Sequence, residues 1–422
     1  MLNRVELCNF RNHRLRKITS NSPCNIILGK NGSGKTSILE SISLLCSGRN
    51  LRGATYIEML FNSTIHFGHS QIENELEINP DTWQVKCSFE SQNKNTLPNN
   101  IEIEYTKEQI NKIITLNGKR IKNMSELKGL CSFIYLTPKN EMIFACNASE
   151  RRSFFDRMVH GIFPSHASLL SQYNHHIKSR LQILKEPHDV LWLDAVENSL
   201  ANLAAQITLS RMHFIKLMQY SYNMIFSNNS EADYLKMFFS ELPLINLTLK
   251  SQILNECGNL SEHYHNSEYI NSTIFSILDN VTKLIDKTLI SHIQEKYKSA
   301  RKEDALLKKS TFGSHKEDFT VFLSSNKFDV KYCSIGEQKL CTMVMLLTYA
   351  NLVRNLDVEN EQPSSNIIML LDDVISRLDQ KYQKALLDAL YRLGIQIWIT
   401  APQLEILSSI KTTTPLLNII TL

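Results

Sequence analysis

The residues with the clearest chemical meaning form a short glycine-rich stretch near the start of the chain. Glycines at positions 29, 32 and 34 precede Lys35 and Thr36 in the pattern G-x-x-x-x-G-K-T. In such a loop the backbone N–H groups surround a phosphate, the lysine reaches the β- and γ-phosphates, and the threonine hydroxyl binds Mg²⁺. The pattern predicts a nucleotide site at Gly29, Lys30, Asn31, Gly32, Ser33, Gly34, Lys35, Thr36 and Ser37.

Two adjacent carboxylates near the other end of the chain would complete such a site. Asp372 and Asp373 directly follow the apolar run 367–371, at the edge where α/β sheets bind ligands. We expect Asp372 to hold Mg²⁺ together with Thr36, and Asp373 to orient or deprotonate the attacking water, with Lys35 as the second catalytic residue. The alternative is that both acids cap the following turn.

A second pattern suited to binding an anion lies at the start of another expected helix. Ser334, Gly336, Glu337 and Gln338 form the sequence S-x-G-E-Q. A serine hydroxyl and the N–H groups of a helix N-terminus can bind an anion. Because the chain already has a phosphate loop, we expect this signature to complete the pocket of another copy of the chain. Taken alone, it would be an ordinary helix cap.

The elements that position these motifs alternate as in an α/β fold. A strand is expected before the phosphate loop and a helix after it. The run 367–371 is apolar throughout, which is typical of a parallel sheet covered on both faces. The elements expected near the C-terminal end are Thr320–Leu323, Gly336–Val353, Ile367–Leu371, Gln380–Leu393 and Ile395–Ile399. Both ends of the chain therefore predict one nucleotide-binding unit that is split by an insertion.

The part of the chain around the phosphate loop is expected to be rich in strands. Residues 2–10 predict a strand with 11–14 as its basic end, and a second strand leads into the loop. Residues 47–53 either close over phosphates or form a solvated loop. From about 64 to 136 the apolar residues alternate, which predicts an antiparallel meander whose last strand ends at Pro138. Asn117-Gly118 within it is a strong hairpin signal.

Helical patterns follow until about Lys309. One apolar seam is expected to pack within the chain, and its residues are Leu193, Val196, Leu200, Leu203, Ile207 and Phe214. A second helix is expected from Ile270 to Ile293, with a basic stretch after it. We therefore expect three parts: residues 1–138 (phosphate loop and meander), 139–309 (helical lobe) and 310–422 (signature and acidic strand). The seams are too short for long coiled-coil arms.

Composition limits the classes of function. The net charge of +4 permits contact with nucleic acid without requiring it, although the first 52 residues are clearly more basic than the rest. The nine cysteines never form C-x-x-C, so we interpret them as thiols of a reducing compartment. With no signal-peptide pattern and no apolar run near ~18 residues, a soluble, cytoplasmic protein without membrane partners is expected.

The motifs in this order resemble an ATP-binding-cassette ATPase head, and more narrowly the RecF family of bacterial recombination mediators. The motifs that carry the resemblance are Asn9–Asn12, Gly32–Thr36, Asn117–Lys119, Ser149–Arg152 with Asp156, Leu370–Val374 and Ser376–Asp379. Two motifs differ from the family pattern. The family's G-P-H-R-D-D is Gly313–Asp318 with Ser314 in place of proline, and Lys139 stands where the family has an acid after proline.

This resemblance implies an α/β fold, a split ABC-type ATPase head with an antiparallel β meander and an inserted helical lobe. It implies ATP and Mg²⁺ as cofactors, and a homodimer that two ATP molecules hold together head to head. Asp379 would be the D-loop acid. A slow Mg²⁺-dependent ATPase is expected to act as a switch, because Thr400-Ala401 stands where cassette transporters have a histidine.

The resemblance also implies partners and a role in DNA replication and in the repair of DNA damage, including the SOS response. The partners would be double-stranded DNA near single-strand gaps and the RecO and RecR mediators, with which the family helps load the RecA recombinase. The candidate DNA contacts are Arg14, Arg16, Lys17, Arg151 and Arg152. Arg151 and Arg152 could equally form ion pairs inside the helical lobe.

Three other interpretations remain. A transporter's nucleotide-binding subunit would have its signature nearer the phosphate loop and a switch histidine. A RecF-like ATPase could serve another ATP-gated DNA role without mediator partners. A degenerate, purely structural DNA-binding protein is the third, and the intact Lys35, Asp372 and Asp373 argue against it.

Overall fold

The structure is a computed structural model, and it describes most of the chain in two compact units. Unit 1 is built mainly from Met1–Glu141 and Asp357–Leu422, and unit 2 mainly from Met142–Asp233 and Phe239–Leu356. The residues described are 1–46, 50–61, 79–90, 99–109, 111–121, 127, 131–185, 189–226, 245–256, 287–323, 328–359, 366–374, 378–402 and 417–422. The two ends of the chain thus meet in one unit, while residues 310–356, which include the signature, belong to unit 2.

An antiparallel sheet forms one layer of unit 1, with strand order β2-β1-β4-β5-β6-β7. Its strands are β1 (Leu2–Phe10), β2 (His13–Thr19), β4 (Thr82–Phe89), β5 (Asn99–Thr106), β6 (Ile113–Leu116) and β7 (Lys119–Arg120). Alternate residues of β4 are buried, as period-two patterning requires. The hairpin at Asn117-Gly118 is confirmed, since β6 and β7 pair across it and both residues have positive φ.

A parallel sheet forms the second layer of unit 1, with strand order β14-β3-β13-β12-β8. Its strands are β3 (Cys24–Leu28), β8 (Cys131–Leu136), β12 (Asn366–Asp372), β13 (Gln396–Ala401) and β14 (Leu417–Thr421). All residues of β3 and β13 are buried, which explains their continuous apolar runs. β8 pairs in parallel with β12, so the prediction that it closes the antiparallel meander is wrong.

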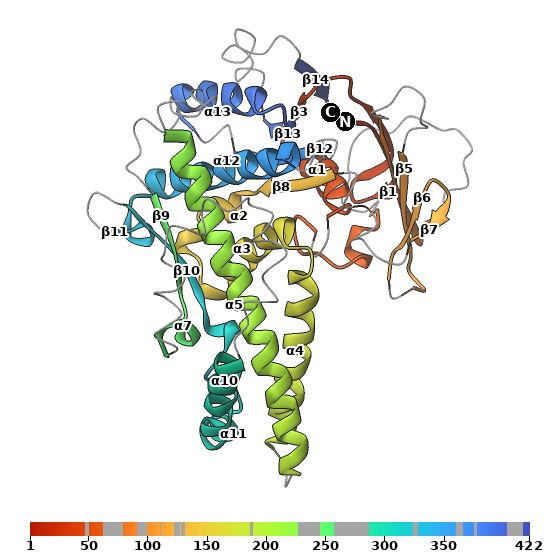
Figure 1. The fold of residues 1–422 in the computed structure, drawn as a ribbon. Helices are drawn as coiled ribbons and strands as arrows, with labels where there is room; N and C mark the ends of the chain where they lie inside the picture. Colours follow the sequence, from red (N-terminus) through yellow and green to blue (C-terminus); the bar gives the residue numbers. More distant parts are fainter. Residues whose placement is uncertain are drawn as a thin grey trace. The chain divides into compact units, whose positions relative to one another are not determined.

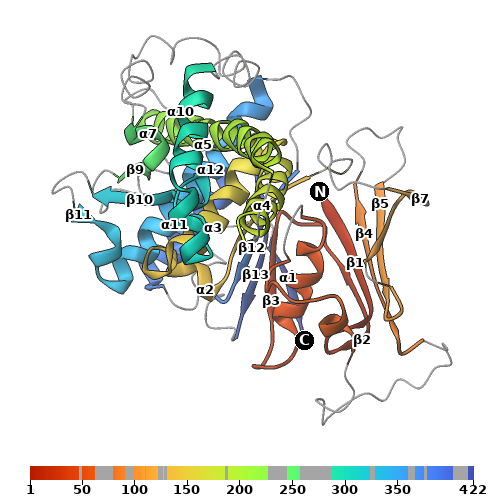
Figure 2. The same ribbon diagram turned by 90° about the horizontal axis from the view of Figure 1, so that it is seen from below.

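Helix α1 (Lys35–Ser43) lies between these two sheets (Figure 2). It contacts β1 on one side and β12 and β13 on the other. The side chain of Gln396 also joins the layers, because its Nε2 donates to Leu2 O at 2.7 Å and its Oε1 accepts from Leu2 N at 2.8 Å. The phosphate-loop helix is therefore held from both faces.

The segment after β1 also differs from its prediction. Residues 11 and 12 form a turn, and His13 begins β2, which pairs with β1 as an antiparallel edge strand. Of the basic residues expected at a strand end, Arg11 therefore lies in the turn, while His13 and Arg14 lie along β2. The reason is local: Asn9 and Arg11 adopt positive φ angles of 51° and 57°, which turn the chain back on itself.

The other short elements of unit 1 are 3₁₀ helix η1 (Ile57–Met59) and helices α2 (Pro138–Glu141) and α13 (Gln380–Arg392). Helix α13 and strand β13 confirm the helix and strand predicted there. The predicted loop 91–100 lies mostly outside the described residues, as do 47–49 and 62–78.

Unit 2 is mainly helical (Figure 1). Its helices are α3 (Ala148–Ile162), α4 (His166–Ile183), α5 (Val190–Phe226), α7 (Gln252–Glu256), α10 (Lys287–Ser299), α11 (Arg301–Leu307) and α12 (Ile335–Glu359), with 3₁₀ helices η4 (Ile143–Ala145), η6 (Ser314–Lys316) and η7 (Val330–Tyr332). The predicted seam is confirmed as internal packing, because all six of its residues are buried along α5. Helices α4 and α10 pack against α5.

Part of the predicted second helix, from Ile270 to residue 286, lies outside the described residues, and the remainder belongs to α10. The helical prediction is wrong at one place. β9 (Ile245–Lys250) is a strand, and it pairs with β10 (Asp318–Leu323), which also pairs with β11 (Phe328–Asp329). Its alternating Ile245, Leu247 and Leu249 have the strand period.

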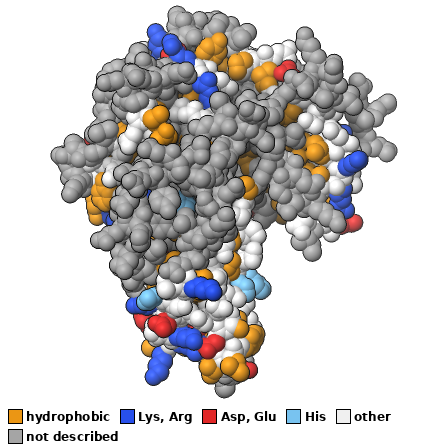
Figure 3. Space-filling model, viewed as in Figure 1, with side chains coloured by type: hydrophobic (Ala, Val, Ile, Leu, Met, Phe, Trp, Pro, Cys, Tyr) orange, Lys and Arg blue, Asp and Glu red, His pale blue; other side chains and the backbone are white. Residues whose placement is uncertain are grey.

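Charges of both signs alternate on the surface where α10 and α11 lie (Figure 3). Lys298 Nζ lies 3.4 Å from Asp194 Oδ2, and Arg301 pairs with both Asp194 and Glu197. Two cations of the predicted basic stretch, Lys298 and Arg301, are therefore paired with acids of α5. Among the described residues, none of the helices combines the length and apolar composition that crossing a membrane requires.

Candidate nucleotide site

The phosphate loop connects β3 to α1, as predicted. Gly32 and Gly34 have φ angles of 86° and 96°, which favour glycine. Lys35 Nζ donates to Gly29 O at 2.6 Å and to Lys30 O at 2.9 Å, so the lysine lies along the inside of the loop. Burial lowers the pKa of Lys35, and the carboxylates of Asp373 and Asp372 oppose that effect. The loop's cation and both acids therefore lie within electrostatic reach of one another.

Two residues of the β1–β2 turn support the loop from outside. Asn12 Nδ2 donates to Gly32 O at 3.1 Å, and His13 Nε2 lies 3.1 Å from Gly34 O. A Cβ at Gly34 would lie 2.4 Å from His13 Nε2 and 2.5 Å from Asn12 Nδ2. The absence of a side chain at residue 34 thus allows this turn to pack directly beneath the loop.

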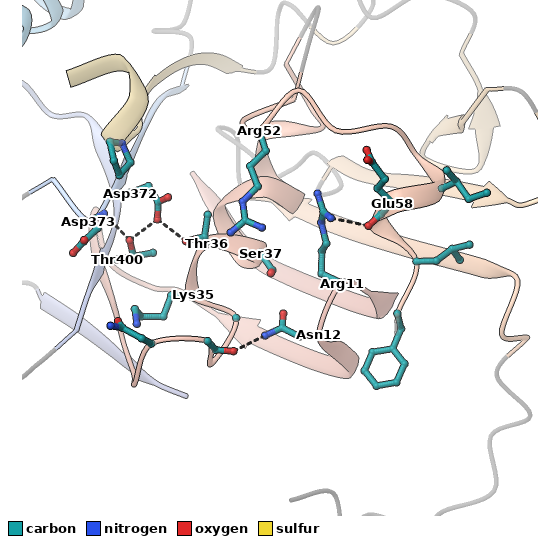
Figure 4. Close-up of a pocket in the computed structure, with 17 residues that line it drawn as sticks. Arg11, Asn12, Lys35, Thr36, Ser37, Arg52, Glu58, Asp372, Asp373 and Thr400 are labelled. Carbon is teal, nitrogen blue, oxygen red and sulfur yellow. Dashed lines mark hydrogen bonds between the residues drawn. The ribbon is translucent and has the colours of Figure 1, made fainter. Parts of the chain in front are cut away.

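The acidic pair lies at the same edge of the sheet as the loop (Figure 4). Thr36 Oγ1 donates to Asp372 Oδ1 at 2.8 Å. Thr400 Oγ1 donates to the same oxygen at 2.8 Å and accepts from Asp373 N at 2.8 Å. Asp373 has a φ of 53°, an uncommon conformation for a residue other than glycine. The end of β12 is therefore fixed by neighbours on both sides.

A cavity of about 700 Å³ opens in front of these groups. Lys35, Thr36, Asp372 and Asp373 line it, together with Arg11 and Asn12 of the β1–β2 turn and Arg52, Ile57 and Phe61 farther along. Its size is that of an ordinary small-molecule site, and its lining combines cations, carboxylates and a few apolar groups.

Arg11 links the rim of this cavity to the phosphate-loop helix. Its guanidinium holds the fully buried carboxylate of Glu40 on α1 with two bonds of 2.8 and 2.7 Å, and NH1 donates to Glu58 O at 2.6 Å. A bidentate pair of this kind fixes orientation as well as charge. Part of the basic excess at the start of the chain is thus neutralised internally.

These residues fit a nucleotide and Mg²⁺. A Cβ at Gly29 would lie 2.5 Å from Ser33 Oγ, so a side chain there would fill the cradle. Ser33 Oγ itself is buried and finds no hydrogen-bond partner among the described residues. A threonine hydroxyl beside one carboxylate is a donor set suited to Mg²⁺, which is usually bound by one or two carboxylates plus phosphate oxygens.

The signature begins α12 in unit 2 and forms a complete capping box. Ser334 Oγ and Ser334 N both donate to Glu337 Oε2, at 2.7 and 2.9 Å, and Glu337 N donates to Ser334 Oγ at 3.4 Å. Gln338 is buried and donates to Cys333 O at 3.0 Å, while Ser334 and Glu337 are exposed. Ser334 and Glu337 thus form the ordinary helix cap that the sequence also allows, and both side chains remain exposed to solvent.

Comparison with known proteins identifies the family. The family described as RecF/RecN/SMC N terminal domain matches residues 1–416. A protein of Rickettsia akari (strain Hartford) named DNA replication and repair protein RecF is 30% identical over 407 residues, which are 96% of this chain and 95% of that protein. The chain belongs to the RecF family. A protein of the same name from Rickettsia africae (strain ESF-5) is 29% identical over 421 residues, 99% of each chain.

Solved structures agree on the fold. One described as the recombination mediator protein RecF-ATPrS in the RecFOR pathway has a TM-score of 0.71 at 22% identity, over 96% of this chain and 93% of that one. A second, RecF-ATP, has a TM-score of 0.70 at 21% identity, over 96% and 92%. The predicted α/β fold, with antiparallel and parallel sheets and a helical insertion, is therefore confirmed.

Asp156, which follows S-E-R-R, and Glu317, which belongs to the motif Gly313–Asp318, bind the same buried arginine in unit 2. Arg211 on α5 pairs with Asp156 through two bonds of 2.8 Å and with Glu317 Oε2 at 2.7 Å. Burial alone would raise the pKa of Asp156, but Arg211 and His166 outweigh it and lower that pKa to about 2. Asp156, the acid after S-E-R-R, and Glu317 of residues 313–318 thus share Arg211, which lies in none of the quoted motifs.

Arg151 and Arg152 lie in this same part of the RecF-family fold. Arg151 makes a bidentate pair with Asp318, at 2.9 and 2.6 Å, and Arg152 NH1 donates to Glu317 O at 2.6 Å. Arg151 therefore forms the ion pair that the sequence allows as an alternative to DNA contact. Arg152 donates to a backbone carbonyl. Their contact with DNA stays a prediction.

The other predicted residues lie on β2 and at the start of α13. Arg14 and Lys17 are exposed on β2, and Arg16 is half-buried. Strand alternation places Arg14 and Arg16 on one face and Lys17 on the other, where its Nζ lies 3.8 Å from Glu6 Oε1. Asp379 is exposed at the N-cap of α13. Residues 375–377 of that motif lie outside the described residues.

Sequence reasoning missed several contributors to the nucleotide site. One is Thr400. It stands in place of a histidine, and its position at the end of β13, beside β12, is a signal that its side chain lies near the acidic pair. His13 and the Arg11–Glu40 pair gave no local signal, because their partners lie 21 and 29 residues away.

Proposed function

We propose that the chain is an ATP-gated DNA-binding ATPase that acts in recombinational DNA repair and in the maintenance of replication gaps. The observation that carries the proposal is the 2.8 Å bond between Thr36 Oγ1 and Asp372 Oδ1 beside Lys35, which brings the phosphate loop and the acidic pair into one cavity. The names of its relatives supply the DNA role.

Each group has a separate task at the nucleotide. The loop N–H groups and Lys35 would bind the phosphates. Thr36 and Asp372 would hold Mg²⁺, which when bound neutralises developing phosphate charge. Asp373 would take the proton of the attacking water, and the Thr400 hydroxyl, which holds Asp373 N, would keep that carboxylate in place. Since Thr400 offers no imidazole, slow turnover suited to a switch is expected.

The signature would act on the nucleotide of a second copy. A Cβ at Gly336 would meet none of the described residues within 4 Å, and its φ is not in the positive region. The chain's own packing therefore gives no reason for glycine at this exposed helix start. Close approach of another molecule is a sufficient reason, and a nucleotide bound to a second phosphate loop would supply it.

The proposed partners follow from the family. They are double-stranded DNA near single-strand gaps, an ATP-dependent homodimer, and the RecR and RecO mediators, in the cytoplasm. Arg14 and Arg16, on one face of an edge strand, are the first candidates for phosphate contacts.

The test is binding of gapped duplex DNA with ATP, with ADP and without nucleotide, across a salt series. We expect tight binding only with ATP, and a linear fall of log K with log salt concentration. Arg14→Gln should reduce the salt slope by about one and weaken binding of all sequences alike. Affinity that does not depend on the nucleotide would refute the switch.

A further inference from the structure

The segment that leads into the signature carries large apolar side chains on its surface. Phe328 on β11 is 47% exposed, Tyr332 on η7 is 68% exposed, and Ile335, which lies inside the signature, is 63% exposed. We call these three residues the collar. Single exposed apolar residues are common on protein surfaces, but a contiguous group of them is typical of a surface that a partner covers.

The two aromatic rings of the collar contact each other. The ring centroids of Phe328 and Tyr332 lie 6.2 Å apart in an edge-to-face arrangement. Lys331 adds a cation at the edge of this group, because its Nζ lies 4.5 Å from the centroid of the Tyr332 ring and 3.7 Å from Asp329 Oδ2. The collar is therefore an apolar surface with a lysine beside it.

The backbone beneath the collar is fixed, although its side chains are exposed. Asp329 Oδ1 accepts from Lys331 N at 3.1 Å. The buried Gln338 of the signature donates from Nε2 to Lys331 O at 3.2 Å and to Cys333 O at 3.0 Å. These two carbonyls lie on either side of Tyr332 in the chain. A tyrosine on a fixed backbone loses little conformational entropy when a partner covers it, which is typical of residues that dominate binding.

The rim of the nucleotide cavity in unit 1 has the complementary chemistry. Ile57 lines this cavity and is about half exposed. Glu58 beside it is also exposed, and its Oε2 accepts from Thr55 N at 2.6 Å and from Thr55 Oγ1 at 2.8 Å. These bonds hold the carboxylate and lower the pKa of Glu58. An exposed isoleucine next to a fixed carboxylate matches an apolar surface with a lysine beside it.

We propose that the collar of one copy packs against the rim of the nucleotide cavity of a second copy, with Tyr332 against Ile57 and Lys331 near Glu58. The inference rests on the proposed function, in which the signature acts on the nucleotide of a second copy. Because Ile335 belongs to the signature, the collar approaches the second copy whenever the signature does. In a two-fold symmetric dimer the contact forms twice.

The test is sedimentation of the full chain with excess ATP and Mg²⁺ over a range of protein concentrations. Tyr332→Ala should raise the dissociation constant of the dimer about 10-fold or more, as loss of a central aromatic anchor does. ATP titration at a low protein concentration should give the wild-type affinity. Leu306→Ser is the matched control, because Leu306 is an exposed apolar residue on α11 of the same unit, and it should leave the dimer unchanged.

Two pairs of substitutions test the partner surface. Ile57→Ser should also weaken the dimer at saturating ATP, and if Ile57 contacts Tyr332 the double variant should be weakened by less than the product of the two separate effects. Lys331→Glu should weaken the dimer as well, and adding Glu58→Lys to the same chain should restore part of the loss.

The outcomes separate the collar from the proposed function. A wild-type chain that stays monomeric with ATP would refute the dimer and the collar together. If wild type dimerises and Tyr332→Ala dimerises equally tightly, the dimer stands and the collar is not part of its interface. Independent effects of Ile57→Ser and Tyr332→Ala would show that the collar packs elsewhere than on this rim, which would also overturn the proposal.

Discussion

The phosphate loop and the signature are both glycine-containing turns at helix starts, yet they are supported in opposite ways. Gly34 packs against Asn12 and His13, and a side chain there would lie 2.4 Å from His13 Nε2. Gly336 is exposed, and in the part of the chain that the structure describes a Cβ there would have no neighbour within 4 Å. The first turn packs against a distant segment of the chain, whereas among the described residues the hydrogen bonds of the second turn are local, to Glu337 and Gln338 of the same helix start.

This difference separates two reasons for glycine. At Gly34 the positive φ and the close neighbours make glycine a requirement of folding. At Gly336 neither applies among the described residues, and our proposal is that the requirement comes from the nucleotide of a second copy. The comparison therefore predicts that changes at the loop act on the isolated chain, and that changes at the signature act on assembly.

The largest expected effect is on turnover. In Asp373→Asn the proton acceptor is lost, and ATP hydrolysis should fall about 100-fold or more. Asparagine tolerates the positive φ of this position, so the fold and ATP affinity should stay close to wild type. Steady-state ATPase rates and ATP titration measure the two quantities. Unchanged turnover would remove Asp373 as the base.

The next effect contrasts the two glycines directly. Gly34→Ala introduces both an unfavourable φ and a contact with His13, and should reduce the free energy of unfolding by about 2–4 kcal/mol. Gly336→Ala should change it by less than about 0.5 kcal/mol, because alanine suits a helix and meets open space. Denaturant titration of both variants without nucleotide gives the values.

The outcome that breaks the comparison is similar destabilisation by both substitutions. It would mean that the fold itself requires Gly336. Gly336 would then give no support for a partner at the signature.

The smallest expected effect is on the pH dependence of stability, through His315 of unit 2. Burial lowers the pKa of His315 to about 4, while the unfolded chain has an ordinary value near 6.5. Between these pH values the unfolded state binds the extra proton, so stability falls as pH drops. Between pH 7 and pH 5 the free energy of unfolding of His315→Gln should fall by about 2 kcal/mol less than that of wild type. Equal losses in urea titrations would show that His315 does not titrate in this window.

The fold could be predicted where periodicity and turn chemistry are local. The apolar runs of β3 and β12, the seam of α5 and the Asn117-Gly118 hairpin all formed as expected. The pairing of β8 with β12 could not be predicted, because a short apolar strand does not reveal which sheet it joins. β9 was missed inside a region of helical patterns, although its alternation was present.

The candidate site shows the same division. The loop and the acidic pair follow from motif chemistry. Their supports do not, because Asn12, His13 and Thr400 act through contacts between segments far apart in sequence. Arg211 is the clearest example: two motifs meet at it, and nothing in the residues around it marks its role.

We propose that one chain holds only part of each nucleotide site and that the signature of a second copy completes it. Sedimentation of Ser334→Arg with ATP tests this proposal most directly. Ser334 is exposed, so arginine should leave the isolated chain folded and able to bind ATP. We predict that wild type sediments as a dimer with ATP and a monomer without it, and that Ser334→Arg binds ATP yet stays monomeric. A Ser334→Arg dimer formed with ATP would contradict the account.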